Sequence, residues 1–196
     1  MDRNAVAEKY EQARRGLKAN VVTVFGYNKP VLIEGGDYQG IWLEDGPLEG
    51  LVYGRFEPEI ALNNHNIFFQ LQRDDGYLPC WIRTGGVGTK QLQTVVPIAK
   101  TAWEVAELTQ REGFLQRAYT ACVAYDRWLK TYRNTRGTGL CEAFCEFDTG
   151  HDNSPRFAGL PKPCPDNDAR KCPDAGNLPF LAPDLSATVY GGRRAL

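Results

Sequence analysis

The chain has 196 residues, enough to bury a hydrophobic core and to form one domain over residues 1–196. Its 42% hydrophobic and 24% charged residues are typical of a folded, soluble protein, and its formal net charge of −1 offers no basic surface to nucleic acid. No apolar run reaches the ~18 residues that a membrane span requires, so no membrane partner is expected. The N-terminal residues are charged rather than signal-peptide-like, which favours a cytoplasmic location.

Apolar residues at helical spacing predict helices in the first half of the chain. Val6, Tyr10, Ala13 and Leu17 share one face of an N-terminal helix. Residues 26–54 hold seven of the 20 glycines and are predicted to be loop. A second helix opens around Pro58 and ends at 74–76.

Two further helices are predicted over residues 93–111 and 115–132. The link between them is so short that they must lie antiparallel, as an αα-hairpin. Trp103 and Trp128 are predicted core residues, and Cys122 a buried thiol. Residues 155–183 hold seven of the 12 prolines and show no helical period, which indicates a functional loop.

A last helix, capped by Asp184 or Ser186, is predicted to continue to residue 196, where it ends in mid-pattern. This ending indicates the N-terminal part of a longer domain, or a chain completed by assembly. The partners left open are therefore a missing C-terminal half and a second copy.

Six cysteines are too few for a disulfide-based scaffold of this length. Cys164 and Cys172 flank a short loop and could form a disulfide or contribute to a zinc site. Neither this pair nor Cys141 with Cys145 has zinc-ribbon spacing, and His151 is the only nearby histidine. No metal and no cofactor are expected.

The segment CEFDTGHDNSPRF, residues 145–157, combines acids, aromatics and an arginine. Asp152 precedes an Asn-Ser-Pro turn, where a helix dipole favours a charged carboxylate. Asp148 and the nearby phenylalanines oppose this effect, because like charge and burial favour a protonated acid. Arg156 could contact a substrate hydroxyl or balance Asp148. The alternative is that both aspartates cap a turn and pair with Arg156.

The run DTGHDNSPRF resembles the acid-bearing motif of the (α/α)6-toroid glycoside hydrolases, the group that includes trehalases, processing α-glucosidases and mannosylglycerate hydrolases. The resemblance implies that Asp152 is the general acid of an inverting mechanism. Asp148 takes the place of the motif's first carboxylate, which is a glutamate in that group, and Thr149 takes the place of its serine. His151 and Arg156 become candidate substrate ligands.

A second resemblance lies in GIWLEDGPLEG, PEIALNN and RDDGYLP, which are similar to the early helix-and-loop segment of the same group. It implies that Trp42, Glu44 and Asn64 bind the terminal sugar, with Asn63, Gln72 and Trp81 as further candidates. From the residues alone, the two asparagines could instead bind neighbouring backbone, because a buried amide must be hydrogen-bonded. A third stretch, APDLSATVYGGRRAL, is similar to the helix that follows the catalytic loop.

Together these resemblances imply an all-α chain of αα-hairpins that forms about half of an (α/α)6 toroid, with long Gly- and Pro-rich loops. The implied function is inverting hydrolysis of an α-linked glucosyl or related sugar, with the general base outside this chain. The alternatives are a non-catalytic carbohydrate-binding or regulatory relative, an inactive fragment and a helical-repeat scaffold. No repeat period supports the scaffold.

Overall fold

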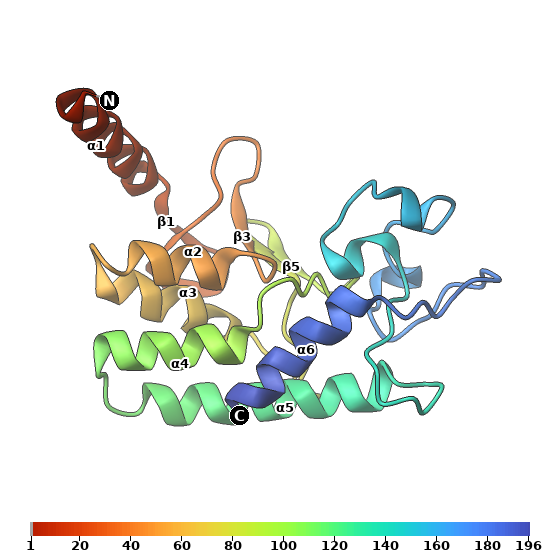
Figure 1. The fold of residues 1–196 in the computed structure, drawn as a ribbon. Helices are drawn as coiled ribbons and strands as arrows, with labels where there is room; N and C mark the ends of the chain where they lie inside the picture. The colour runs from red at the N-terminus through yellow and green to blue at the C-terminus, as the bar shows by residue number, and fades with distance from the viewer. Residues whose placement is uncertain (1) are drawn as a thin grey trace.

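The computed structural model describes residues 2–196 as a helical layer with a small β region and an irregular C-terminal lobe (Figure 1). In chain order the elements are α1 (Arg3–Ala19), β1 (Val21–Val24), β2 (Tyr27–Leu32), β3 (Gly40–Trp42), α2 (Gly46–Tyr53), α3 (Pro58–Gln70), β4 (Trp81–Arg83), β5 (Gly86–Gly88), α4 (Ile98–Thr109), α5 (Phe114–Tyr132) and α6 (Pro183–Ala195).

The strands correct the all-α prediction. β1 and β2 form an antiparallel hairpin, and β3, β4 and β5 form an antiparallel sheet in that order. The predicted loop over residues 26–54 therefore contains β2, β3 and α2. Its glycines mark turns and close contacts around these elements rather than continuous loop.

The predicted helices around Pro58, over 93–111 and over 115–132 are confirmed as α3, α4 and α5. Two pairs of helices, α2 with α3 and α4 with α5, lie side by side, and α6 packs on α4 (Figure 1). Closure of such hairpins into a toroid stays a prediction.

The core prediction is right for Trp128 and Cys122, which are buried, and wrong for Trp103, which is 48% exposed. The buried positions of α4 are Ile98, Thr101, Ala102 and Val105, at helical spacing, so the next residue after Ala102 points outward. The indole of Trp128 lies among tyrosine rings and donates to Asp75 Oδ2 at 3.2 Å.

The terminal helices differ from prediction in detail. α1 has no buried residue, and its expected core face is exposed where the helix projects from the body (Figure 1). α6 begins after Ala182 without a side-chain cap, so the predicted capping by Asp184 or Ser186 is wrong. Both side chains have tertiary partners instead: Asp184 pairs with Arg156, and Ser186 accepts a hydrogen bond from the amide of Cys141.

Residues 140–182 contain only three single turns of 3-10 helix, at Glu146–Thr149, Pro155–Phe157 and Pro165–Asn167. This confirms that residues 155–183 lack a helical period up to the start of α6. Among the helices of residues 2–196, none is sufficiently long and apolar to cross a membrane.

Candidate active site

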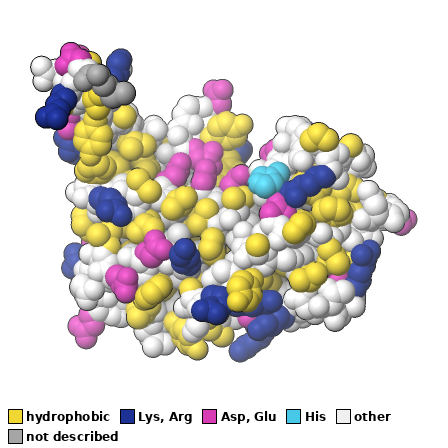
Figure 2. All heavy atoms as spheres, in the orientation of Figure 1, with side chains coloured by type: hydrophobic (Ala, Val, Ile, Leu, Met, Phe, Trp, Pro, Cys, Tyr) yellow, Lys and Arg dark blue, Asp and Glu magenta, His cyan; other side chains and the backbone are white. Residues whose placement is uncertain are grey.

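A cavity of about 450 Å³ lies between the β3–β4 strand pair and the loop that carries Asp152. Figure 2 shows acidic side chains gathered on the face between the raised loop that joins β2 to β3 and the C-terminal lobe. The lining combines aromatic, acidic, amide and basic side chains: Glu34, Tyr38, Trp42, Glu44, Asp45, Trp81, Arg83, Lys90, Gln91, Gln93, Phe147 and Asp152. Such a mixture suits a polar ligand with apolar faces.

The aromatic wall is set by strand register. Trp42 on β3 lies directly opposite Trp81 on β4, so both indoles project on the same face of the sheet. Tyr38 meets Trp42 edge to face, with ring centroids 5.7 Å apart. The Arg83 guanidinium lies 4.5 Å from the Trp42 ring centroid and 5.1 Å from that of Trp81. These contacts hold the aromatic surface in place.

Glu34, Glu44 and Asp45 form the acidic wall of the cavity. Burial, followed by the repulsion and hydrogen bond of Asp45, raises the pKa of Glu34 to about 8. Burial raises the pKa of Glu44, and its hydrogen bond to Gln93 opposes the shift. On α2, burial and the negative charge of Asp45 raise the pKa of the Glu49 carboxyl to about 7. This region therefore binds protons more tightly than free carboxylates do.

A chain of amides orients Glu44. Gln93 Nε2 donates to Glu44 Oε2 at 2.7 Å, and Gln91 Nε2 donates to Gln93 Oε1 at 2.9 Å. Gln91 is 3% exposed, and its Oε1 is buried without a partner among residues 2–196. A buried acceptor of this kind costs free energy unless something donates to it.

Asp152 lines the cavity from an exposed turn. Partial burial raises its pKa, the negative charge of Glu146 adds to the shift, and Lys162 opposes it. The like-charged neighbour expected from the sequence is thus Glu146 rather than Asp148. Glu146 is itself held in place because its Oε1 accepts from the amide of Asn153.

Gly150 brings the acid-bearing turn against Glu44. Its φ is +69°, which disfavours any other residue. A Cβ added there would lie 2.3 Å from Val95 Cγ2 and 2.6 Å from Glu44 Oε1. Only glycine allows the DTGHD segment this close to the acidic wall.

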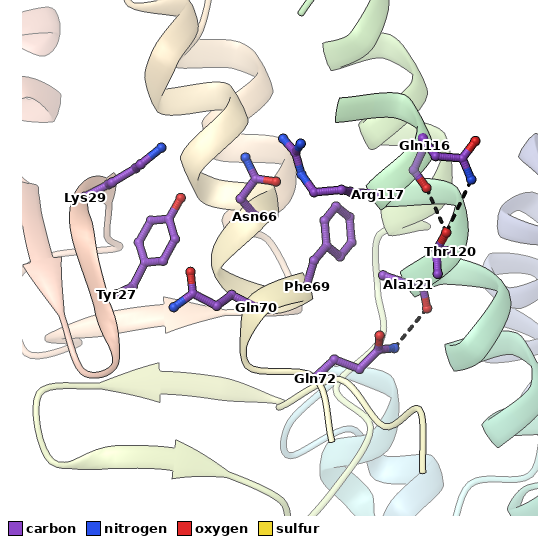
Figure 3. A pocket seen from close by; sticks show the side chains of 10 residues that line it. All are labelled: Tyr27, Lys29, Asn66, Phe69, Gln70, Gln72, Gln116, Arg117, Thr120 and Ala121. Atoms are coloured by element: carbon purple, nitrogen blue, oxygen red, sulfur yellow. Dashed lines mark hydrogen bonds between the residues drawn. The ribbon is translucent and has the colours of Figure 1, made fainter. Parts of the chain in front are cut away.

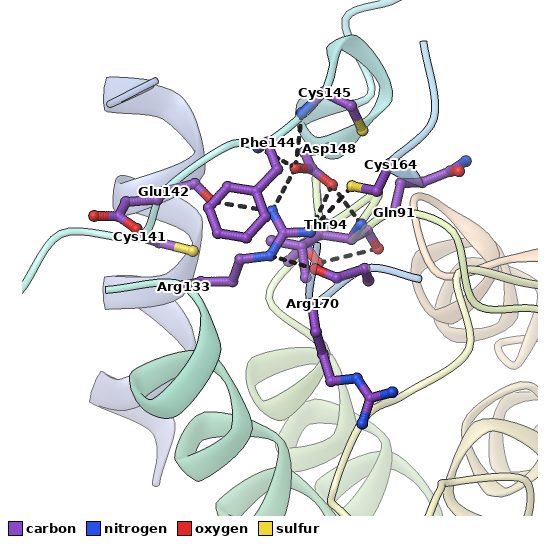
Figure 4. A network of polar contacts seen from close by, with 12 residues as sticks. Gln91, Thr94, Arg133, Cys141, Glu142, Phe144, Cys145, Asp148, Cys164 and Arg170 are labelled. Atoms are coloured by element: carbon purple, nitrogen blue, oxygen red, sulfur yellow. Dashed lines mark hydrogen bonds and ion pairs between the residues drawn. The ribbon is translucent and has the colours of Figure 1, made fainter. Parts of the chain in front are cut away.

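Asp148 does not line the cavity, and the structure corrects its expected role beside Asp152. The carboxylate is fully buried and forms an ion pair with Arg133, which is also fully buried (Figure 4). It also accepts from the amides of Leu92 at 2.7 Å, Phe144 at 2.6 Å and Cys145 at 3.3 Å. Both carboxylate oxygens of Asp148 therefore have partners, and these contacts join the end of α5 to the segments around Leu92 and Phe144.

His151 and Arg156 also lie outside the cavity lining. His151 Nδ1 is 3.0 Å from Asp184 Oδ2, and Arg156 contacts both His151 and Asp184. One interpretation of the sequence expected Arg156 to pair with Asp148. In the structure Arg156 pairs instead with Asp184, at the start of α6. Both side chains connect the acid-bearing turn to that helix.

The predicted amide ligands bind backbone. Asn64 accepts from the amide of Leu32 at 2.9 Å and donates to the carbonyls of Leu32 at 3.0 Å and Gly46 at 2.8 Å. Asn63 donates to the carbonyl of Pro30 and accepts from the hydroxyl of Tyr27. Neither lines the cavity, so the structure favours the backbone-binding interpretation over the sugar-binding one.

Gln72 belongs to a different cavity. This larger space, of about 710 Å³, lies between β2, α3 and α5 and has no carboxylate in its lining (Figure 3). The Gln72 amide donates to the carbonyls of Gly76 at 2.8 Å and Ala121 at 2.9 Å. Of the predicted site residues, the smaller cavity thus collects Trp42, Glu44, Trp81 and Asp152.

The sequence interpretation missed eight lining residues: Glu34, Tyr38, Asp45, Arg83, Lys90, Gln91, Gln93 and Phe147. Two of these had a usable signal. Asp45 adjoins Glu44, and Arg83 lies two residues after Trp81, on the same face of a strand. The two glutamines lie in an irregular segment, where no period indicates direction.

Solved structures share this fold. The GH63 mannosylglycerate hydrolase from Thermus thermophilus, crystallised with Tris, matches with a TM-score of 0.56 and 20% identity over 76% of this chain and 39% of that one. An uncharacterized conserved protein from the same organism matches with a TM-score of 0.55 and 23% identity over 93% and 48%. The chain thus spans less than half the length of either protein.

Comparison with curated proteins finds no match. A model of the mannosylglycerate hydrolase MGH1-like glycoside hydrolase domain, however, matches residues 38–182, which include every lining residue of the cavity except Glu34. The chain belongs to this glycoside hydrolase family.

Proposed function

We propose that the protein containing this chain hydrolyses an α-linked glucosyl or related sugar, with inversion at the anomeric carbon and with Asp152 as the general acid. The observation that carries this proposal is that Asp152 shares one cavity with Trp42, Trp81 and the oriented carboxyl of Glu44. The similar mannosylglycerate hydrolase has been crystallised with glucose, which supports a sugar as the ligand.

The cavity matches the chemistry of a sugar. A pyranose has apolar C–H faces that stack on indoles, which Trp42 and Trp81 provide. It also has hydroxyl edges that donate to carboxyls and exchange hydrogen bonds with amides. Glu44, held by Gln93, and the unpartnered Oε1 of Gln91 offer acceptors for those edges.

Asp152 is suited to donate a proton. Burial and Glu146 raise its pKa, which increases the fraction of protonated acid at a given pH. In the proposed mechanism Asp152 protonates the glycosidic oxygen as the bond to the anomeric carbon breaks. A water molecule attacks the opposite face of the sugar and transfers its proton to the base.

The base is proposed to lie outside this chain. In inverting glycosidases the two carboxyls are ~6.5–9.5 Å apart, with the attacking water between base and sugar. Asp148 cannot serve, because it is buried against Arg133 away from the cavity. Glu34 and Glu44 hold protons more tightly than free carboxylates, which leaves a smaller fraction of each in the ionised form that a base requires.

The test uses the full-length protein with Asp152→Asn, and Asp166→Asn as the control. Asp166 is exposed and pairs only with Lys171 among the described residues, so its substitution should leave turnover unchanged. Substrates are mannosylglycerate and aryl α-glucosides and α-mannosides with good or poor leaving groups. D152N should lose about 10²–10⁴-fold in kcat on poor leaving groups. The loss should be small for dinitrophenyl glycosides, which need no protonation.

The stereochemistry is read by NMR from the first-formed anomer of the product, which should be β from an α-glycoside. Equal losses for D152N on good and poor leaving groups would remove Asp152 from the acid role. Calorimetric binding of the sugars without turnover by the full-length wild type would favour the non-catalytic carbohydrate-binding alternative.

A further inference from the structure

Two cysteine side chains face each other beside the acid-bearing segment. Cys145 is 0% and Cys164 2% exposed, and they form a buried cluster with Phe144. Their sulfur atoms and a carboxylate oxygen of Asp148 all lie within 4.8 Å of one another. The interaction with the Cys164 thiol is the largest of the influences that raise the pKa of Cys145.

The backbone already holds these two segments side by side. The amide of Glu146 donates to the carbonyl of Pro161 at 2.9 Å, and that of Phe147 donates to the carbonyl of Lys162 at 3.3 Å. Both hydrogen bonds join residues that lie between Cys145 and Cys164 in the chain, so they already close most of the loop that a link between these cysteines would form. A covalent link between the sulfurs would therefore require side-chain rotation more than movement of the backbone.

A metal ion is a poor occupant of this cluster. The Arg133 guanidinium forms the ion pair with Asp148, and its Nη2 lies 3.7 Å from Cys164 Sγ (Figure 4). A cation bound by the two sulfurs and the carboxylate would face this positive charge and compete with it. A disulfide is neutral and leaves the ion pair intact.

The disulfide that the sequence left open, Cys164 with Cys172, is not formed. All six cysteines are free thiols, and Cys172 is exposed whereas Cys164 is buried. Cys164 faces Cys145 instead, and its amide is tied to the carbonyl of Lys90 at 2.9 Å.

We propose that Cys145 and Cys164 form a disulfide under oxidising conditions, linking the segment that leads to Asp152 with the loop at 158–167. This proposal does not depend on the hydrolysis of sugars. It concerns the redox state of the chain, which can be measured without a substrate.

Glutathione disulfide is the oxidant in the balanced reaction. One cysteine thiolate attacks a glutathione sulfur, forms a mixed disulfide and releases a glutathione thiolate. The second cysteine then loses its proton and displaces the remaining glutathione. The two cysteine sulfurs are oxidised, and one glutathione disulfide is reduced to two molecules of glutathione.

The experiment treats the full chain with glutathione disulfide at a guanidinium concentration that opens the loops, then removes the denaturant and alkylates free thiols. Cys172→Ser is the parent variant, because an exposed thiol would retain glutathione. Of its five thiols, three should remain by intact mass, and a peptide pair linked through Cys145 and Cys164 should appear after proteolysis. The oxidised chain should melt several degrees higher than the reduced chain.

Cys145→Ser in the same parent should keep all four of its thiols after the treatment. A linked peptide that joins other cysteines would overturn the proposal, as would the absence of any bridge in the parent after oxidation. Zinc binding at one ion per chain that protects Cys145 and Cys164 from alkylation would also overturn it, in favour of a metal site.

Discussion

Replacing Asp148 by Asn tests whether this carboxylate is structural. The substitution keeps the shape of the side chain but leaves the Arg133 guanidinium buried without its counter-charge. It also replaces one acceptor oxygen by a donor, opposite the amides of Leu92, Phe144 and Cys145.

Breaking one side of a buried ion pair costs about 3–5 kcal/mol, because the remaining charge is desolvated and unpaired. For a chain of this length this corresponds to a fall in Tm of roughly 6–20 °C. Arg133 keeps its bonds to the carbonyls of Ala169 and Glu142, which places the expected value toward the lower half of that range.

The assay is urea unfolding followed by far-UV circular dichroism and tryptophan fluorescence. Arg133→Met alone and combined with D148N completes a double-mutant cycle. Because the double variant removes both charges, its loss should be smaller than the sum of the single losses, with a coupling of about 1–3 kcal/mol. The reasoning is refuted if D148N unfolds at the same urea concentration as the wild type, or if the two losses add.

Gly150→Ala should destabilise the chain by more than the ~1–2 kcal/mol cost of a left-handed residue, because the new methyl would also clash with Val95 and Glu44. Gly159→Ala is the matched control, with φ of +81° and open space around it, so equal losses in urea unfolding would contradict the predicted clash. Glu34 has a pKa raised from 4.5 to about 8, so its contribution to stability is complete below pH 4.5 and is lost as the pH rises through 8. Thermal melts of Glu34→Gln across this range should show a shallower decline than the wild type, and an unchanged slope would contradict the shift. Glu49→Gln should flatten the decline in the same way between pH 4.5 and about 7, and wild-type behaviour there would count against the burial of this carboxyl.

Much of the helical framework could be predicted from local pattern. α3, α4 and α5 follow apolar spacing, and the short link between the last two requires an antiparallel pair. The strands β3, β4 and β5 were missed because each has only three residues, too short for an alternating pattern to emerge from glycine-rich segments.

By itself the sequence determined every helix except α2, and the presence of an acid-bearing turn with aromatic neighbours. Only the tertiary structure decided which aspartate faces the cavity. Asp148 and Asp152 are four residues apart in a segment without a regular period, so spacing could not tell their directions. Arg133, at the end of α5, draws Asp148 into the core because a buried guanidinium requires a counter-charge, and the left-handed turn at Gly150 leaves Asp152 lining the same cavity as Glu44.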